Sequence, residues 1–189
     1  QLFEEKSDRV GPLLEEALAA VRGLDFSTAR TRFHQVLEKD PDNAVALKQL
    51  FFLEAQDPQA TDLSRLASRT LRVLLREGEP YEEVERIYTD YCHRDPRVEL
   101  DPELAVRLAA LFLKAERTDL GEPLLAKALK SSVPLQDAPS VLLRYGRHYR
   151  EHGRARKSRA CFRALVKRLP ESPEARMIRS REAEAQGTE

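Results

Sequence analysis

The side chains of this chain that could do chemistry are two cysteines, four histidines and a dense set of arginines and lysines. Cys92 is followed by His93, but neighbours in sequence face different sides of a helix, so they do not assemble a nucleophile and its base. Cys92 and Cys161 lie far apart on separate predicted helices. We expect both to be free, buried or half-buried thiols in a reducing compartment, which predicts neither a catalytic cysteine nor a disulfide.

Histidines and carboxylates give no stronger catalytic signal. His148 and His152 are four residues apart and share a helix face, a spacing that can hold zinc. No glutamate takes the usual catalytic place between them and no further Cys/His cluster follows, so we predict a partly exposed surface pair. Glu82 and Glu83 fall in the first turn of a predicted helix, where carboxylates favour the helix dipole. With no phosphate-cradling glycine loop either, we predict a non-catalytic chain without a cofactor or a metal.

Basic residues gather towards the end of the sequence. Residues 139–189 hold 13 Lys+Arg against 6 Asp+Glu, although the formal net charge of the whole chain is zero. The simplest interpretation is a solvated face on exposed helices. The alternative is a site for an acidic peptide, an anionic membrane surface or nucleic acid. Nucleic acid is disfavoured because aromatic residues for base stacking are not interleaved with the basic ones.

Composition predicts an all-α chain. Charged residues make up 34% of the 189 residues and glycine only 7 positions, while Leu, Ala, Arg and Glu dominate. No apolar run approaches the roughly 20 residues that cross a bilayer. The sequence opens with Gln1 rather than Met, so it leaves open an anchor or another domain upstream.

Apolar periodicity, prolines and glycines divide the chain into helices. A helix over 2–21 has a potential break at Gly11-Pro12, and Thr61 is the expected N-cap of the fourth helix. Asp101 is expected to cap a helix that begins at Pro102. Three helices lie between Pro41 and Pro96, where strict pairing would give two or four. The other predicted helices cover 27–39, 43–54, 61–76, 81–93, 120–130, two segments between 140 and 170, and 173–185.

The stretch 140–172 carries the most specific pattern. Leu142, Tyr145, Gly146 and Tyr149 fall on one side of a helix, which Gly153 ends. Small residues at Gly146 and Ser158 would let two antiparallel helices approach closely, with Tyr149 and Phe162 filling the space beside them. Pro170 then stops the second helix. The step from Ser158 to Pro170 equals the step from Ala29 to Pro41, which indicates an internal repeat.

These residues resemble the tetratricopeptide repeat, a 34-residue helix pair with the pattern W-x2-L-G-x2-Y…A-x3-F…P. The initial Trp is absent throughout. Further copies of the pattern are carried by Leu108-Ala109, Phe112, Gly121, Leu125 and Pro134; by Leu71, Leu75, Val84, Tyr88 and Pro96; and by Ala17, Ala29, Phe33 and Pro41. The resemblance implies one domain over 1–189, a right-handed superhelical solenoid of about ten helices, irregular in the middle. Its expected parts are repeat-like units near 10–43, 65–98, 102–135 and 139–172, an extra helix at 43–56 and a capping helix at 173–186.

In such repeats the first helix of each pair lines a concave groove that binds peptides or proteins. The resemblance therefore implies partner-binding residues at Arg69, Arg76, Lys114, Arg147 and Arg150, whose cationic groups would hold the carboxylates of an acidic peptide. The asparagines of the family's carboxylate-clamp subset are missing at the matching positions, which disfavours a chaperone tail as the ligand.

The whole chain is also similar to the soluble repeat-bearing tail that some bacterial rhomboid-type membrane proteins carry after their transmembrane helices. No catalytic motif of those proteins is present. We predict a non-catalytic interaction scaffold in the cytoplasm, attached to a membrane protein upstream of Gln1 if that similarity holds. The alternative is an assembly, oligomerisation or membrane-proximal regulatory domain of a larger membrane-linked protein. Oligomeric state and partner identity stay open.

Overall fold

The computed structural model describes residues 2–95, 99–131 and 133–186, and side chains within residues 10–181. Its Cα positions divide the chain into two compact units, Gln1–Leu100 and Asp101–Glu189. Each unit is described by itself. The prediction of a single domain over 1–189, with its superhelical course, stays a prediction.

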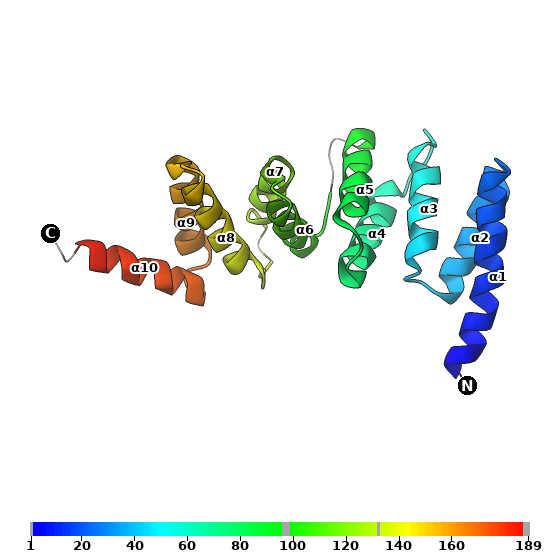
Figure 1. Ribbon diagram of the computed structural model, residues 1–189, viewed down its shortest axis with the longest axis horizontal. Coiled ribbons are helices and arrows are strands. Elements are labelled where there is room, and N and C mark those ends of the chain that lie inside the picture. The colour runs from blue at the N-terminus through cyan, green and yellow to red at the C-terminus, as the bar shows by residue number, and fades with distance from the viewer. Residues whose placement is uncertain (1, 96–98, 132, 187–189) are drawn as a thin grey trace. The chain divides into compact units, whose positions relative to one another are not determined.

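The first unit consists of five helices in its described part (Figure 1). They are α1 (Leu2–Arg22), α2 (Phe26–Lys39), α3 (Ala44–Ala55), α4 (Leu63–Glu77) and α5 (Tyr81–Arg94). α1 runs through Pro12 without the break that the sequence allowed. α1 and α2 form a pair around a core of fully buried Ala17, Ala29 and Phe33. The predicted irregular middle is confirmed, because α3 packs against α2, α4 and α5 instead of joining one partner.

One predicted cap in this unit is wrong. α4 begins at Leu63, so its N-cap is Asp62 rather than Thr61, and the Asp62 side chain makes no capping hydrogen bond. The backbone of Asp62, with φ of −118° and ψ of 21°, is not in the extended conformation usual for an N-cap, and its carboxylate lies 4.0 Å from the Arg65 guanidinium on the first turn. The far end of α4 follows the rules for helix ends, since Gly78 takes the left-handed conformation with φ of 71° that glycine adopts without a steric cost.

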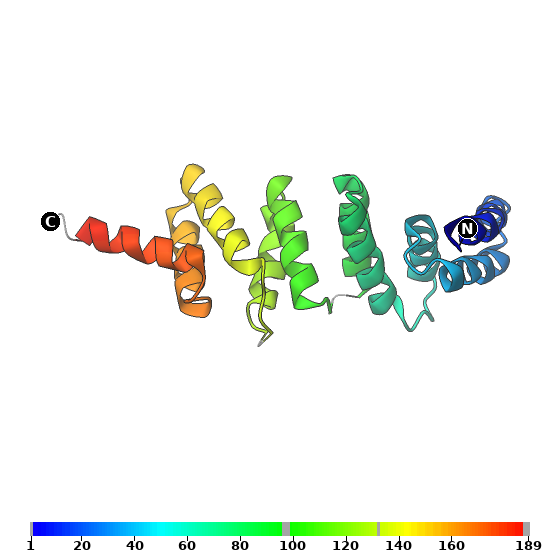
Figure 2. The ribbon, with the colours of Figure 1, turned by 90° about the horizontal axis from the view of Figure 1, so that it is seen from below.

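The second unit is built from two clear helix pairs and an end helix within the described residues (Figures 1 and 2). Its helices are α6 (Pro102–Lys114), α7 (Thr118–Ala128), α8 (Ala138–Glu151), α9 (Ala155–Arg168) and α10 (Pro173–Gln186). α6 pairs with α7 and α8 with α9. α10 packs on α8 and α9 through buried Ala175 and Ile178. All secondary structure in the described part of the chain is helical, which confirms the all-α class.

Close approach between helices sets the packing of this unit. A Cβ on Gly146 would stand 2.3 Å from Cε1 of Phe162, so only glycine lets α9 come this near to α8. A Cβ on Gly121 would stand 1.9 Å from the Tyr145 hydroxyl, which donates a 2.9 Å hydrogen bond to the Ala109 carbonyl. These contacts confirm the predicted role of Gly146 and Phe162, and they join α6, α7 and α8 at one buried phenol.

Candidate functional site

Four arginines stand along one face of α4. Arg65, Arg69, Arg72 and Arg76 are separated by four, three and four residues, so successive side chains lie within about one helical turn of each other. We call this set the α4 arginine row. The opposite face of the helix holds buried Ala67, Leu71 and Leu74 and faces the core of the unit. The amphipathic pattern of α4 therefore fixes the row on the outside of the unit.

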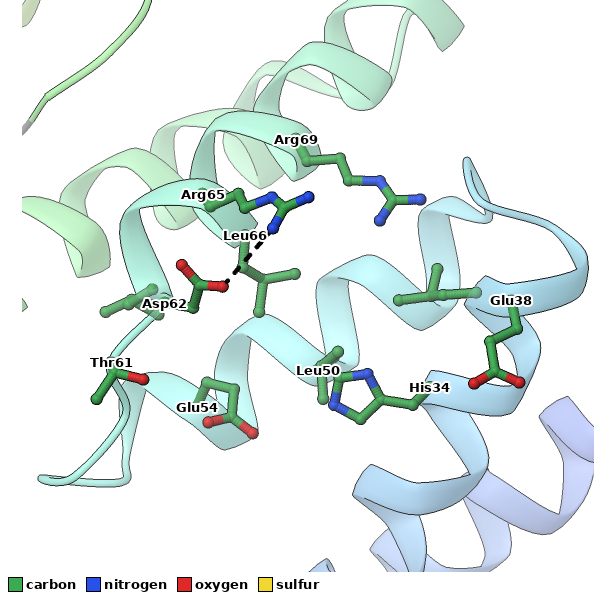
Figure 3. A pocket seen from close by; sticks show the side chains of 11 residues that line it. His34, Glu38, Leu50, Glu54, Thr61, Asp62, Arg65, Leu66 and Arg69 are labelled. Atoms are coloured by element: carbon green, nitrogen blue, oxygen red, sulfur yellow. Dashed lines mark ion pairs between the residues drawn. The ribbon is translucent and has the colours of Figure 1, made fainter.

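The first half of the row borders a hollow of about 440 Å³ between α2, α3 and α4, which we call the α2–α4 hollow (Figure 3). Figure 3 shows Arg65 and Arg69 above it, with His34 and Glu38 of α2 and Leu50 and Glu54 of α3 on the other sides. Leucines supply its apolar lining: Leu37, Leu50, Leu63 and Leu66. A polar edge over an apolar interior suits a peptide that carries both carboxylates and aliphatic side chains.

The second half of the row borders an adjoining hollow of about 400 Å³ that includes Asp42, the Asp42 hollow. Arg65 and Arg69 line both hollows. Arg76 Nη1 lies 2.7 Å from Asp42 Oδ2, and Arg69 Nη2 donates a hydrogen bond to the Pro41 carbonyl. These two contacts hold the turn between α2 and α3 against α4. The Arg76 guanidinium is therefore already paired with a carboxylate of the chain itself, that of Asp42.

Electrostatics at the row follow from these contacts. The hydrogen bond from Arg76 lowers the pKa of the Asp42 carboxyl and raises the pKa of Arg76 itself. Arg72 differs, because its exposed side chain makes no ion pair within 4.0 Å to any carboxylate in the part of the chain that the structure describes. Arg72 is thus the member of the row whose charge the fold does not use.

Carboxylates around the α2–α4 hollow limit what can bind there. Glu38, Glu54 and Asp62 all line it. Glu54 is held by Arg30, whose Nε lies 3.0 Å from Glu54 Oε1, and Asp62 faces Arg65. A nucleic-acid backbone brings a negative charge at every residue and would meet these carboxylates. A peptide can place its own carboxylates on the row and apolar side chains beside the glutamates.

The predicted partner-binding residues divide between the two units. Arg69 and Arg76 belong to α4 in the first unit. Lys114 is exposed at the end of α6, and Arg147 and Arg150 are exposed on α8, all in the second unit. A groove that contains all five residues stays a prediction.

The sequence reasoning missed Arg65 and Arg72, although a signal for them was present. Spacing of four, three and four along a predicted helix is the pattern of one face, and it applied to all four arginines equally. Analogy with the repeat pattern selects Arg69 and Arg76, but neither Arg65, which lies one turn before Arg69, nor Arg72, which lies between the two. Only the packing shows that the whole row borders the two hollows.

His148, on α8, and His152, the C-cap residue of that helix, lie together as their spacing predicted. Their ring centroids are 4.1 Å apart, and the His152 Nδ1 lies 2.7 Å from the His148 carbonyl oxygen. Burial and the neighbouring His152 lower the pKa of His148, so the His148 imidazole stays neutral to a lower pH than an isolated histidine. No group of three or more His, Cys, Asp or Glu residues in the described part is arranged to hold a metal ion.

Both cysteines are free and half-buried, in agreement with the expectation from sequence. Burial raises the pKa of the Cys92 thiol, and burial raises the pKa of Cys161 to about 11. A reactive cysteine needs the opposite shift, because the thiolate is the nucleophile. Neither thiol has the electrostatic surroundings of a catalytic cysteine.

Among the described residues, no helix combines the length and the apolar character that crossing a membrane requires.

The fold defines the class of protein: consecutive amphipathic helices pair and stack, as in helical repeat proteins. Residues 143–188, which include most of α8, all of α9 and the end helix, match the model of the tetratricopeptide repeat family. The resemblance predicted from Tyr145, Gly146, Tyr149, Phe162 and Pro170 is thereby confirmed over the matched residues. Tetratricopeptide repeat proteins generally mediate protein–protein interaction.

Solved structures with a similar course are helical repeat proteins of low sequence identity. PilF of Pseudomonas aeruginosa is 12% identical with a TM-score of 0.45, and the match covers 94% of this chain and 99% of that one. PilW, described as a type IV pilus biogenesis factor, is 17% identical with a TM-score of 0.45 over 92% of this chain and 84% of its own. A thermophilic repeat protein of Thermus thermophilus is 17% identical with a TM-score of 0.34, covering 89% and 95%. At these TM-scores the likenesses carry no argument about function. No curated protein sequence matches the chain.

Proposed function

We propose that this chain is a non-catalytic interaction module whose partner is a protein segment rich in carboxylates. The observation that carries the proposal is the α4 arginine row beside two adjoining hollows, one of them with an apolar interior. Guanidinium groups bind carboxylates through paired, charge-assisted hydrogen bonds. Lys114, Arg147 and Arg150, which the resemblance also implies as partner-binding residues, would offer cationic groups of the second unit to the partner.

Spacing favours an extended segment on the row. Successive arginines are three or four residues apart on α4, which at about 1.5 Å rise per residue places them roughly 4.5–6 Å apart along the helix axis. Alternate residues of an extended peptide repeat at roughly 6.6 Å. A segment that alternates acidic and aliphatic residues can thus place each carboxylate near a guanidinium and turn its aliphatic side chains toward the α2–α4 hollow.

The test uses a fluorescent peptide of alternating Glu and Leu, and the same peptide with Gln in place of Glu. We expect the full chain to bind the Glu peptide, with affinity falling as salt is raised. Arg72→Glu should weaken binding about tenfold without a loss of helix, because Arg72 is exposed and makes no ion pair with any carboxylate of the described residues. Arg22→Glu, the same charge change at the exposed end of α1, is the matched control and should change affinity less than about twofold.

Two results would contradict this assignment. Equal binding of the Glu and Gln peptides would show that carboxylates are not recognised. Equal loss in Arg72→Glu and Arg22→Glu would show attraction to net charge rather than to the row. The double variant Arg69→Glu with Arg147→Glu tests the groove predicted from the resemblance. This variant should lose a peptide partner in a pull-down.

The alternative of an assembly or membrane-proximal domain predicts other measurements. An assembly domain would show a mass in solution that rises with concentration. Docking on an anionic membrane would appear as liposome binding that disappears at high salt.

A further inference from the structure

We propose a second docking surface, in the second unit, for an amphipathic helix with an acidic border from a partner protein. It is the groove between α7, α8 and α9, with a volume of about 250 Å³, which we call the α7–α9 groove. Its lining is mostly apolar, with Leu125 and Leu129 from α7, Leu142 from α8, and Ala160 and Ala164 from α9. This surface lies apart from the α4 arginine row, and the proposal does not rest on the proposed function of that row.

Most of α9 stays accessible in the part of the chain that the structure describes. Only Ser158 and Leu165 of α9 are buried. The side that carries Ala160 and Ala164 borders the groove, and Ala160 is exposed there, as is Ala126 on the facing side of α7. Alanines make the border low, so the backbone of a partner helix can approach closely and its longer side chains can enter the groove.

The polar groups inside the groove are already satisfied. Glu122 accepts hydrogen bonds from the Lys157 ammonium, at 2.6 Å, and from the Tyr149 hydroxyl. The Lys157 ammonium also lies 5.2 Å from the centre of the Tyr149 ring. An apolar side chain that enters the groove therefore leaves no buried charge unpaired at this point.

The border of the groove is strongly positive. α9 contains six Lys and Arg residues and no Asp or Glu. Arg156, Arg163 and Lys167 are spaced by seven and four residues, so they share one side of α9, next to the side that lines the groove. None of the three makes an ion pair within 4.0 Å with a carboxylate of the described residues. Carboxylates beside the apolar face of a partner would complement them.

Backbone hydrogen bonding favours a helix over an extended segment in the groove. The groove is bounded by helices, whose main-chain groups already bond within each helix. An extended segment would bury its own N–H and C=O groups against apolar side chains with nothing to receive them. A helix brings its backbone bonds already made and offers apolar anchors at i, i+3, i+4 and i+7.

Binding is tested on the full chain with a designed helical probe of about 14 residues, roughly four turns. The probe has Leu at i, i+3, i+4 and i+7 with Glu beside this face, and its control has the same composition in scrambled order. We expect the probe to bind and the scrambled peptide to bind at least about tenfold more weakly. Ala160→Glu should weaken probe binding about tenfold or more, because it places a carboxylate in the apolar lining of the groove, where it would repel the Glu residues of the probe.

A matched pair of charge reversals locates the partner on α9. Arg163→Glu lies beside the groove side of α9, whereas Arg159→Glu changes the net charge equally on a side that does not line the groove. Arg163→Glu should weaken the probe several-fold and Arg159→Glu less than about twofold. All three substituted positions, including Ala160, are exposed, and circular dichroism confirms that each variant is folded.

A thiol footprint gives an independent measurement. Cys161 lines the groove and Cys92 lies on α5 in the other unit. The probe should slow alkylation of Cys161 while Cys92 reacts at its usual rate, as mass spectrometry of digested peptides can report.

Several results would contradict helix binding in the α7–α9 groove. Equal affinity for the probe and its scrambled control overturns it, as does unchanged Cys161 alkylation at saturating probe. Protection of Cys161 by phosphatidylserine vesicles but not by the probe would assign the surface to a membrane instead. Loss of probe binding in Arg72→Glu but not in Ala160→Glu would overturn this groove and leave the α4 assignment standing. If Arg72→Glu loses binding of the extended Glu peptide while the helical probe still binds, fails in Ala160→Glu and protects Cys161, the groove assignment stands. If the extended peptide does not bind the chain at all, only the assignment of the α4 arginine row is overturned.

Discussion

The phenol of Tyr145 occupies the space that a side chain at position 121 of α7 would fill, and this position is a glycine. Its ring is completely buried and its hydroxyl reaches the Ala109 carbonyl on α6 across the backbone of Gly121. One hydrogen atom, the side chain of glycine, thus permits a contact that connects three helices. Residues this small decide helix spacing because protein interiors have no spare volume.

Gly121→Ala is expected to destabilise the second unit. A methyl group there would overlap the Tyr145 hydroxyl and lie 3.2 Å from the Ala109 oxygen, which overpacks the site at a cost of about 1–3 kcal/mol. The gain in helix propensity returns at most about 1 kcal/mol. Urea unfolding followed by circular dichroism measures the difference.

The control for this substitution is Gly11→Ala on α1, where a Cβ meets no atom within 4 Å and stability should stay equal or rise. Tyr145→Phe removes the oxygen that the methyl group would strike. The double variant should therefore lose less stability than the sum of the single changes. Strict additivity would contradict the proposed clash.

Asp42 and Arg76 allow a prediction about protonation. The guanidinium holds the Asp42 pKa below its ordinary 3.8, so the pair stabilises the fold above about pH 4, and this contribution is lost as the pH falls through the lowered pKa. In Arg76→Gln the pKa of Asp42 should rise toward its ordinary value, as NMR titration of the carboxyl carbon would show. High salt should shrink the shift, since both groups are exposed. A pKa that does not move in Arg76→Gln would rule out the pair as its cause.

Among the elements, helix starts differ in how firmly they are held. Asp101 accepts hydrogen bonds from the backbone N–H groups of Glu103 and Leu104 at 3.1 Å each, ahead of Pro102 in the first turn of α6. Asp62 holds the same position before α4 without a capping hydrogen bond. The same residue type thus has two energetic roles, set by backbone geometry at the helix start.

Asp101→Ala is expected to cost about 0.5–2 kcal/mol of stability, because two backbone donors lose their acceptor. Asp62→Ala is the matched control and should cost a few tenths of a kcal/mol at most, since only a surface contact with Arg65 is lost. Thermal unfolding of the two variants in one buffer checks this. A similar loss at both positions would mean that the capping bonds do not account for the effect.

At the scale of the whole molecule, each unit contains its own buried core. Phe33, Leu47 and Leu71 are fully buried in the first unit, and Leu108, Phe112 and Tyr145 in the second. These residues lie on helices of their own unit, so we expect each unit to remove most of its apolar surface from water by itself.

A fragment of residues 101–189 should therefore keep its helices when it is produced alone. Circular dichroism should show a helical spectrum and a cooperative melt, because the pairs α6/α7 and α8/α9 and the end helix α10 are all present. A fragment with Tyr145→Ala serves as the destabilised control, expected to lose about 3–5 kcal/mol as other large aromatic truncations do. A spectrum without helix in the unaltered fragment would show that its core depends on the rest of the chain.

The sequence by itself determined the helices and one repeat. Apolar residues at helical spacing, together with Gly78, Gly153 and Pro102, are local signals, and they predict where most helices lie, although the start of α4 differs from its prediction. Gly146 and Phe162 were also readable, since their spacing across a predicted turn brings them opposite each other.

Only the tertiary structure decided which surfaces became sites. The α4 arginine row borders hollows because α2 and α3 fold back beside it, and the α7–α9 groove exists because three helices meet around Leu142 and Tyr145. The irregular packing of α3 likewise depends on neighbours far along the chain. Spacing within a helix predicts which residues share a face. What that face packs against depends on contacts between segments far apart in the sequence, which a local pattern does not contain.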